Sequence, residues 1–157
     1  MKSLSLCLAV FVLAIVSAAG QAKKLTNDPL TGLPVSPAVL DSEPDKMPNS
    51  QVCKSKMQGE FYPLSNIMDP AKAIKMDAAA AWYASHLSGF TKVQGYESGR
   101  SQIAFYNADR TIVIFLTGQS GAPGENTGAY SVSYQRYQPG LSEKTIVGLT
   151  QGKMVCN

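Results

Sequence analysis

The chain has 157 residues, of which 45% are hydrophobic and 16% are charged, and its formal net charge at pH 7 is +3. This length suits one domain with a hydrophobic core of its own. Its Lys and Arg residues are scattered and never form a run of five, so the sequence lacks the basic stripe that is typical of nucleic-acid-binding proteins. We therefore expect a single domain that binds no nucleic acid.

Residues 1–22 have the pattern of a secretory signal peptide. Lys2 supplies the positive start, residues 4–16 form an apolar run, and residues 17–20 are the small residues that a signal peptidase requires. A membrane-spanning helix needs about 20 apolar residues, and this run is shorter. We predict that the chain is exported to the periplasm or secreted, that residues 1–22 are removed, and that no transmembrane span remains afterwards.

The export signal decides how the three cysteines are interpreted. Cys7 lies in the apolar run and leaves with it, so Cys53 and Cys156 remain in a compartment where disulfides form. We predict a bridge between these two residues. The alternatives are two buried free thiols, or a cysteine nucleophile that is activated by His86, the single histidine of the chain.

Proline dominates the segment at residues 23–50. Proline has no backbone N–H and blocks helix formation, so we predict an extended or partly disordered arm that acts as a spacer. The alternative is that the apolar residues of the arm hold it against the domain, which we expect to span residues 51–157. The prolines are Pro29, Pro34, Pro37, Pro44 and Pro48.

The first part of the predicted domain contains strands and then one helix. Residues 52–64 can form one or two short strands. Asp69 and Pro70 are typical of a helix N-terminus, the Ala-rich stretch at residues 78–87 favours helix, and Gly89 ends it. Helical spacing places one set of side chains on a single face, which we expect to be buried. These side chains belong to Ala79, Trp82, Tyr83, His86 and Phe90.

Beyond the helix, the apolar residues alternate with a period of two, which is typical of strands. We predict strands at residues 91–97, 101–106, 111–117 and 130–135, and one or two more at residues 145–149 and 153–156. The β-branched run at residues 111–117 is the candidate central strand. Because the helix face and the sheet face each need a partner, we predict an α+β fold with one main helix packed on an antiparallel sheet of about four to five strands.

The sequence contains no recognisable catalytic or metal-binding motif, so we predict no catalytic residue, no metal site and no cofactor. His86 has no Asp or Glu three or four residues away to orient it, and no serine lies in a G-x-S-x-G context. We expect a half-buried helix histidine that donates to a backbone carbonyl. The acidic residues Asp41, Glu43 and Asp45 lack the glycine and glutamate of an EF-hand loop, so we expect a solvated stretch.

The glycine-rich loop at residues 118–128 is the first candidate for ligand binding. Its glycine spacing matches neither a dinucleotide fingerprint nor a phosphate-binding loop, and it precedes a strand. The simplest interpretation is a flexible hairpin connection. If the domain binds a ligand, we expect the following residues to take part: Gly118, Gln119, Ser120, Gly121, Gly124, Glu125 and Asn126.

Tyrosines in the strand half are a second candidate. On alternate strand positions they could form a platform for a sugar or a peptide, whereas the commoner role of such residues is to fill the core between sheet and helix. The residues concerned are Tyr96, Tyr106, Tyr130, Tyr134 and Tyr137.

Three runs of the sequence carry a resemblance, namely WYASHLSGF, FYNADRTIVI and YSVSYQRYQPGLSEKTI. Over about residues 57–147 the chain resembles a family of small exported bacterial proteins of unassigned function, in which a Trp-Tyr helix leads into an antiparallel sheet. The resemblance implies export and this fold, and it implies no activity. The order of helix and sheet also resembles cystatin-like inhibitors, but their Gln-x-Val-x-Gly hairpin is absent, and residues 145–148 only loosely echo it.

We therefore expect a non-enzymatic binding or envelope-associated module that recognises an unknown protein or envelope ligand. The alternatives are a small hydrolase that uses His86 and a cystatin-like inhibitor or ligand carrier. The hydrolase predicts a cleft where the imidazole meets a hydroxyl and a carboxylate. The inhibitor or carrier predicts an exposed wedge at residues 118–128 or a groove lined by tyrosines.

Overall fold

The computed structural model describes residues 25–41, 43–66 and 68–156. The predicted signal peptide and Cys7 lie outside the described residues, so both remain predictions. Within the described part of the chain, no helix is long and apolar enough to cross a membrane.

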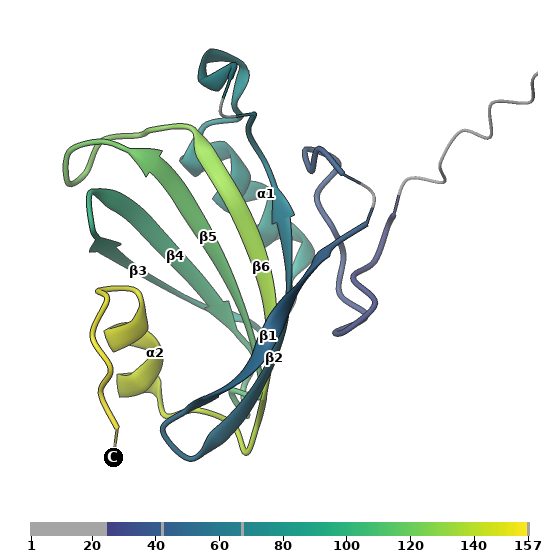
Figure 1. Cartoon of the computed structure of the whole chain (residues 1–157), viewed down its shortest axis with the longest axis vertical. Coiled ribbons are helices and arrows are strands. Elements are labelled where there is room, and N and C mark those ends of the chain that lie inside the picture. Colours follow the sequence, from purple (N-terminus) through teal and green to yellow (C-terminus); the bar gives the residue numbers. More distant parts are fainter. Residues whose placement is uncertain (1–24, 42, 67, 157) are drawn as a thin grey trace, which may run out of the picture.

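The domain is built on one six-stranded antiparallel sheet in the order β1-β2-β6-β5-β4-β3, with two short helices on opposite faces (Figure 1). The predicted fold of one main helix on four to five strands is therefore wrong. The strands are β1 (Asp45–Val52), β2 (Ser55–Pro63), β3 (Thr91–Glu97), β4 (Arg100–Tyr106), β5 (Ile112–Ser120) and β6 (Ala129–Gln138). The helices are α1 (Met76–His86) and α2 (Glu143–Leu149), and a 3-10 turn, η1 (Pro70–Lys72), precedes α1.

Strand β1 was not among the strands predicted from the sequence. It begins at Asp45, inside the proline-rich range, and pairs with β2 as a hairpin. The ladder is interrupted between Met47 and Ser50, so Pro48 lies where no regular pair forms. A proline is tolerated on an edge strand or at a bulge because its missing N–H breaks no hydrogen bond there.

Helix α2 replaces a predicted strand at residues 145–149. Ser142 caps it, because the Ser142 hydroxyl accepts a hydrogen bond from the backbone N–H of Thr145 at 3.1 Å. Its β-branched residues favour strand by composition, but the cap and the complete burial of Ile146 stabilise a helix instead.

Helix α1 begins at Met76, later than the Asp69–Pro70 pair predicts. The backbone N–H of Met76 donates to the carbonyl of Thr127, which ties the helix start to the strand-connecting loop. Its buried face consists of Met76, Ala79, Ala80 and Tyr83. Trp82 is only half-buried and His86 is exposed, so the predicted aromatic stripe lies at the margin of the interface.

A tyrosine cluster forms the core between α1 and the sheet. Tyr62 and Tyr134 pack edge to face, with ring centroids 5.5 Å apart, and the Tyr134 hydroxyl donates to the Tyr83 hydroxyl at 3.0 Å. Burial raises the pKa of Tyr83 to about 12, so this hydroxyl stays neutral. Of the five tyrosines named from the sequence, Tyr106, Tyr134 and Tyr137 are buried, and Tyr96 and Tyr130 are half-buried.

The segment before β1 covers the same core, as in the alternative interpretation of the proline-rich arm at residues 23–50. Val35 and Val39 are buried against the cluster. Asp28, only 1% exposed, accepts hydrogen bonds from the Tyr62 hydroxyl at 2.9 Å and from the backbone N–H of Thr31 at 2.8 Å. These contacts hold the segment on the sheet by polar as well as apolar interactions.

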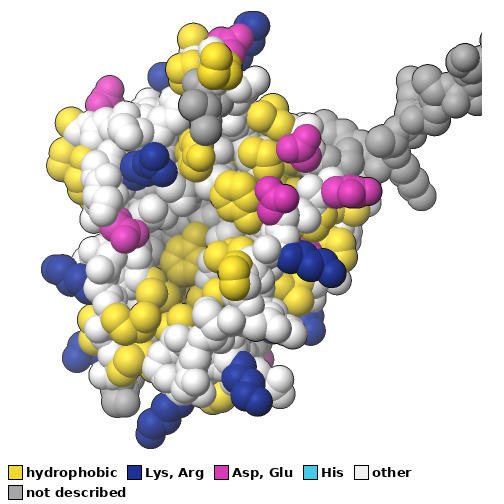
Figure 2. Space-filling view, in the orientation of Figure 1, with side chains coloured by type: hydrophobic (Ala, Val, Ile, Leu, Met, Phe, Trp, Pro, Cys, Tyr) yellow, Lys and Arg dark blue, Asp and Glu magenta, His cyan; other side chains and the backbone are white. Residues whose placement is uncertain are grey.

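The second core lies on the other sheet face, under α2. Val113, Tyr137 and Ile146 are buried there, and hydrophobic side chains gather at the bottom of a hollow in this face (Figure 2). The predicted disulfide is confirmed: Cys53 and Cys156 are bonded, with Cα atoms 5.5 Å apart. The bond ties the C-terminal segment after α2 to the turn between β1 and β2.

Candidate functional site

The candidate site lies at the end of the sheet where β4 starts, β5 ends and β6 starts, at the upper end of the sheet in Figure 1. The β4–β5 and β5–β6 ladders are both irregular at this end of the sheet. Arg100 pairs with Ser120, although Gln102 pairs with Thr117, and the β5–β6 register shifts between Thr117 and Gly118. These bulges add residues to β5 and β6, and bulges of this kind change the direction of side chains at the end of a sheet.

Arg100 is the charged group of the site. Its guanidinium carbon lies 5.0 Å from the centre of the Tyr130 ring, which is a cation–π contact. The only ion pair among the described residues joins Lys72 to Asp69, so Arg100 forms none with a described carboxylate, although Glu97 is its partner across the β3–β4 hairpin. This contact holds the guanidinium over the ring, and its N–H groups donate no hydrogen bond to another described residue, so they are free to donate to a ligand.

Ser65 supplies a second polar group. The residue is 6% exposed, its backbone N–H donates to the Tyr130 carbonyl at 3.2 Å, and its hydroxyl has no hydrogen-bond partner among the described residues. A buried hydroxyl without a partner costs about 1–3 kcal/mol. Such groups in folded proteins call for a specific explanation, and one explanation is a ligand that supplies the missing partner.

Two cavities meet at Arg100 and Ser120. The first, of about 340 Å³, is lined by Ser65, Pro70, Arg100, Gln119, Ser120 and Tyr130. The second, of about 380 Å³, is lined by Glu97, Ser98, Arg100, Gln102, Thr117 and Ser120. Their size is in the range of small-molecule sites. Hydroxyls and amides dominate the lining, and the two charges, on Arg100 and Glu97, have opposite signs.

The predicted binding loop divides between two places. Gln119 and Ser120 line the Arg100 cavities. Gly124, Glu125 and Asn126 line a different cavity of about 320 Å³, between the loop, α1 and β3–β4. The seven predicted residues are therefore close together in the chain, but they do not form one site in the structure.

The two remaining loop residues are structural. A Cβ atom at Gly118 would lie 2.9 Å from the Thr127 hydroxyl, so only glycine fits without a shift. The backbone N–H of Gly121 donates to the Gly99 carbonyl at 2.9 Å, and the Tyr96 hydroxyl donates to the Gly121 carbonyl. These bonds fix the loop to the β3–β4 hairpin and so position Ser120 beside Arg100.

His86 lies at the other end of α1 from the loop. Its ring stacks on Trp82, with centroids 4.0 Å apart, and its Nδ1 atom lies 2.7 Å from the Trp82 carbonyl oxygen and 2.9 Å from the Ser85 hydroxyl. The predicted contact with a backbone carbonyl is present, although the side chain is exposed rather than half-buried. No carboxylate hydrogen-bonds to the imidazole among the described residues.

Sequence reasoning missed Arg100 and Ser65. Arg100 follows the tight turn at Ser98 and Gly99, where an arginine looks like an ordinary surface residue. Ser65 lies just after β2, far from Arg100 in the chain. The described part of the chain holds no group of three or more His, Cys, Asp or Glu residues that could bind a metal ion.

Comparison with known proteins adds no relative. No protein-family model matches the chain, and no curated protein or solved structure is detectably similar to it. The resemblance to small exported bacterial proteins therefore stays a prediction from the sequence.

Proposed function

We propose that the protein is an exported, non-enzymatic binding module that holds a small carboxylate-bearing ligand against Arg100. The observation that carries this proposal is the combination of an unpaired guanidinium stacked on Tyr130 with the buried, unpartnered hydroxyl of Ser65 beside it. One ligand group that is both anionic and a hydrogen-bond acceptor satisfies both residues, provided that the Ser65 side chain turns toward the cavity, because its hydroxyl is buried in this structure.

The charges favour a carboxylate over a dianion such as phosphate. The site has a single cation, and Glu97 lines the adjoining cavity, where its ionised form repels a second negative charge on the ligand. A carboxylate matches the planar fork of a guanidinium and accepts two parallel hydrogen bonds from it. The body of the ligand then lies in the second cavity, against Gln102 and Thr117.

The chemistry of the lining favours binding over reaction. Its described residues supply donors, acceptors, one positive charge and the carboxylate of Glu97. No hydrogen bond joins that carboxylate to a hydroxyl of the described lining, so the base–nucleophile pair that covalent catalysis needs is not assembled there. His86 lies at the far end of an 11-residue helix, which is about 16 Å long. The disulfide supports export, because such bonds persist in oxidising compartments.

Calorimetric titration with a matched ligand pair tests the proposal. N-acetylalanine carries a carboxylate, and N-acetylalanine amide has nearly the same shape without the charge. We expect the acid to bind and the amide to bind at least about tenfold more weakly, because hydrogen bonds to charged groups contribute about 1.5–3 kcal/mol.

Two substitutions with the same loss of charge complete the test. Arg100→Gln should abolish the difference between the acid and the amide. Lys144→Gln on α2 removes a positive charge away from the cavities and should leave it unchanged. Equal affinities of the acid and the amide for the unmodified protein, or an unaltered affinity of the acid for the Arg100→Gln variant, would contradict the proposal.

A further inference from the structure

A second surface, separate from the Arg100 site, lies on β1, β2 and β6 near the opposite end of the sheet. It borders a cavity of about 460 Å³ whose polar lining includes Asn49, Gln51, Lys56, Gln58, Arg136 and Gln138. We refer to these six residues as the amide–cation face. All six side chains are exposed, and the α1 helix covers only the neighbouring part of the same sheet face.

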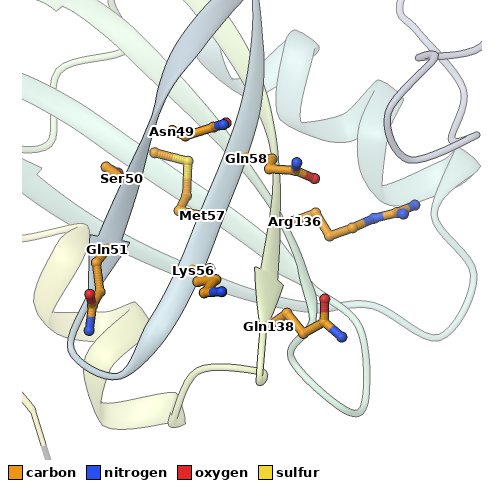
Figure 3. A pocket seen from close by; sticks show the side chains of 8 residues that line it. All are labelled: Asn49, Ser50, Gln51, Lys56, Met57, Gln58, Arg136 and Gln138. Carbon is orange, nitrogen blue, oxygen red and sulfur yellow. The ribbon is translucent and has the colours of Figure 1, made fainter.

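Strand register arranges this face in rows. Lys56 on β2 is paired with Gln138 on β6, and Gln58 is paired with Arg136 two residues further along (Figure 3). Gln51 on β1 is paired with Lys56 and extends that row to a third strand. Neighbouring strands lie about 4.8 Å apart and successive rows about 7 Å apart, so a regular grid of amides and cations is presented on a rigid backbone.

The charge of the face is positive and unbalanced. No carboxylate lines the cavity, and neither Lys56 nor Arg136 forms an ion pair with another described residue. The next acidic side chain along β2, Glu60, lies one row further on the same sheet face, where it is buried close to Asp28 and accepts a hydrogen bond from the Leu30 backbone N–H at 3.3 Å. An anionic partner therefore meets two exposed cations, whereas the acid in the adjoining row is buried.

The amides narrow the class of partner. An amide side chain offers donors and an acceptor together, and this combination suits the hydroxyls of a sugar. A peptide usually needs a free strand edge or an apolar pocket. Both edges of β2 and β6 are paired, and the free outer edge of β1 carries Pro48 at an irregularity of its ladder, which disfavours the addition of a further strand. Single-stranded nucleic acid usually needs aromatic side chains for stacking, and none lines this cavity.

We propose that the amide–cation face binds an acidic polysaccharide, with Lys56 and Arg136 on its carboxylate groups and the Gln and Asn side chains on its hydroxyls. Several sugar units can lie across the three strands, so the face suits a polymer rather than a single sugar. The Arg100 site lies at the other end of the sheet and takes no part in this contact.

Titration with uronic acid oligomers tests this inference. The probe is tetragalacturonate, and its methyl ester is the uncharged comparison. We expect the acid to bind at least about fivefold more tightly than the ester, and we expect its affinity to fall as salt is added, because exposed charges are screened. Arg136→Gln should weaken binding of the acid about fivefold.

Further variants separate recognition of a sugar from simple attraction of charge. Gln58→Ala should weaken tetragalacturonate binding several-fold with no change in net charge, whereas Lys144→Gln should leave it unaltered. Near-UV circular dichroism checks that each variant is folded. The inference is overturned if tetragalacturonate fails to bind, if poly-glutamate or dextran sulfate binds as tightly and Gln58→Ala has no effect, or if Arg100→Gln alone abolishes binding.

Discussion

Removing the disulfide between Cys53 and Cys156 should destabilise the protein strongly, although it removes little core packing. The bond joins residues that are 103 positions apart in the chain. In the unfolded state it closes a loop that contains most of the domain, and loop closure lowers the conformational entropy of that state. For a loop of this length the chain-entropy model gives about 4.7 kcal/mol of stabilisation.

The structure indicates which segment should lose its contacts first when the disulfide is removed. Without the bond, the segment after α2 is held by a few contacts, among them the backbone bond from Lys153 to Gly148 and the bond from the Thr145 hydroxyl to the Val155 carbonyl at 2.8 Å. We expect a fall in Tm of about 10–20 °C, since a chain of this size loses roughly 2–4 °C for each kcal/mol.

Urea unfolding of the Cys53→Ser/Cys156→Ser variant, and of the unmodified protein with and without a reductant, measures this effect. The oxidised protein should unfold at the highest urea concentration and with the smallest m value, because its unfolded chain is more compact. The reduced protein and the variant should coincide, and the reductant should leave the variant unchanged. Free energies of unfolding that agree within about 0.5 kcal/mol for oxidised and reduced protein would refute the reasoning.

Three further changes test other contacts. Ser65→Ala should raise the stability of the ligand-free protein by up to about 1–3 kcal/mol in thermal unfolding, because it deletes a buried hydroxyl without a partner, while it weakens binding of N-acetylalanine. Burial and the neighbouring Asp28 raise the pKa of Glu60 above its ordinary 4.5, so the folded protein holds this proton more tightly. Stability should therefore fall as pH rises from 4.5 through the raised pKa, and Glu60→Gln should remove that dependence in urea titrations. Gly95→Ala should lower Tm, because a Cβ atom there would lie 2.3 Å from the Thr150 carbonyl oxygen, and Gln94→Ala on the exposed side is its control.

Local chemistry made part of the architecture predictable. The strands β3 to β6 show alternating or β-branched patterns, and each lies close to its predicted range. The disulfide followed from the export signal and from the parity of the cysteines. These features depend on neighbouring residues or on a simple count, so one sequence is enough to predict them.

The remaining errors have physical causes beyond local pattern. Pro48 in β1, together with the prolines before it, hid an edge strand, because the irregularity between Met47 and Ser50 accommodates Pro48. The strand-like residues of α2 became a helix because Ser142 caps it and Ile146 is buried. In each case, tertiary pairing or packing outweighed the intrinsic preference of the residues.

The candidate site was only partly accessible from the sequence. Gln119 and Ser120 lie in the predicted loop, whereas Arg100, Tyr130 and Ser65 come from three separated segments. They meet because the bulges in the β4–β5 and β5–β6 ladders shift the register at this end of the sheet. Sequence periodicity cannot give the position of such a shift, so the constellation appears only in three dimensions.

Nuclear magnetic resonance with ¹⁵N-labelled protein tests the proposed binding role most directly. As N-acetylalanine is added, the Arg100 side-chain Nε signal and the backbone amides of Ser65 and Ser120 should shift together and saturate with one affinity. The same titration of the Arg100→Gln variant should leave both amides in place. Shifts that spread over exposed lysines, or that gather at Arg136 while the Arg100 signal stays unchanged, would contradict the account.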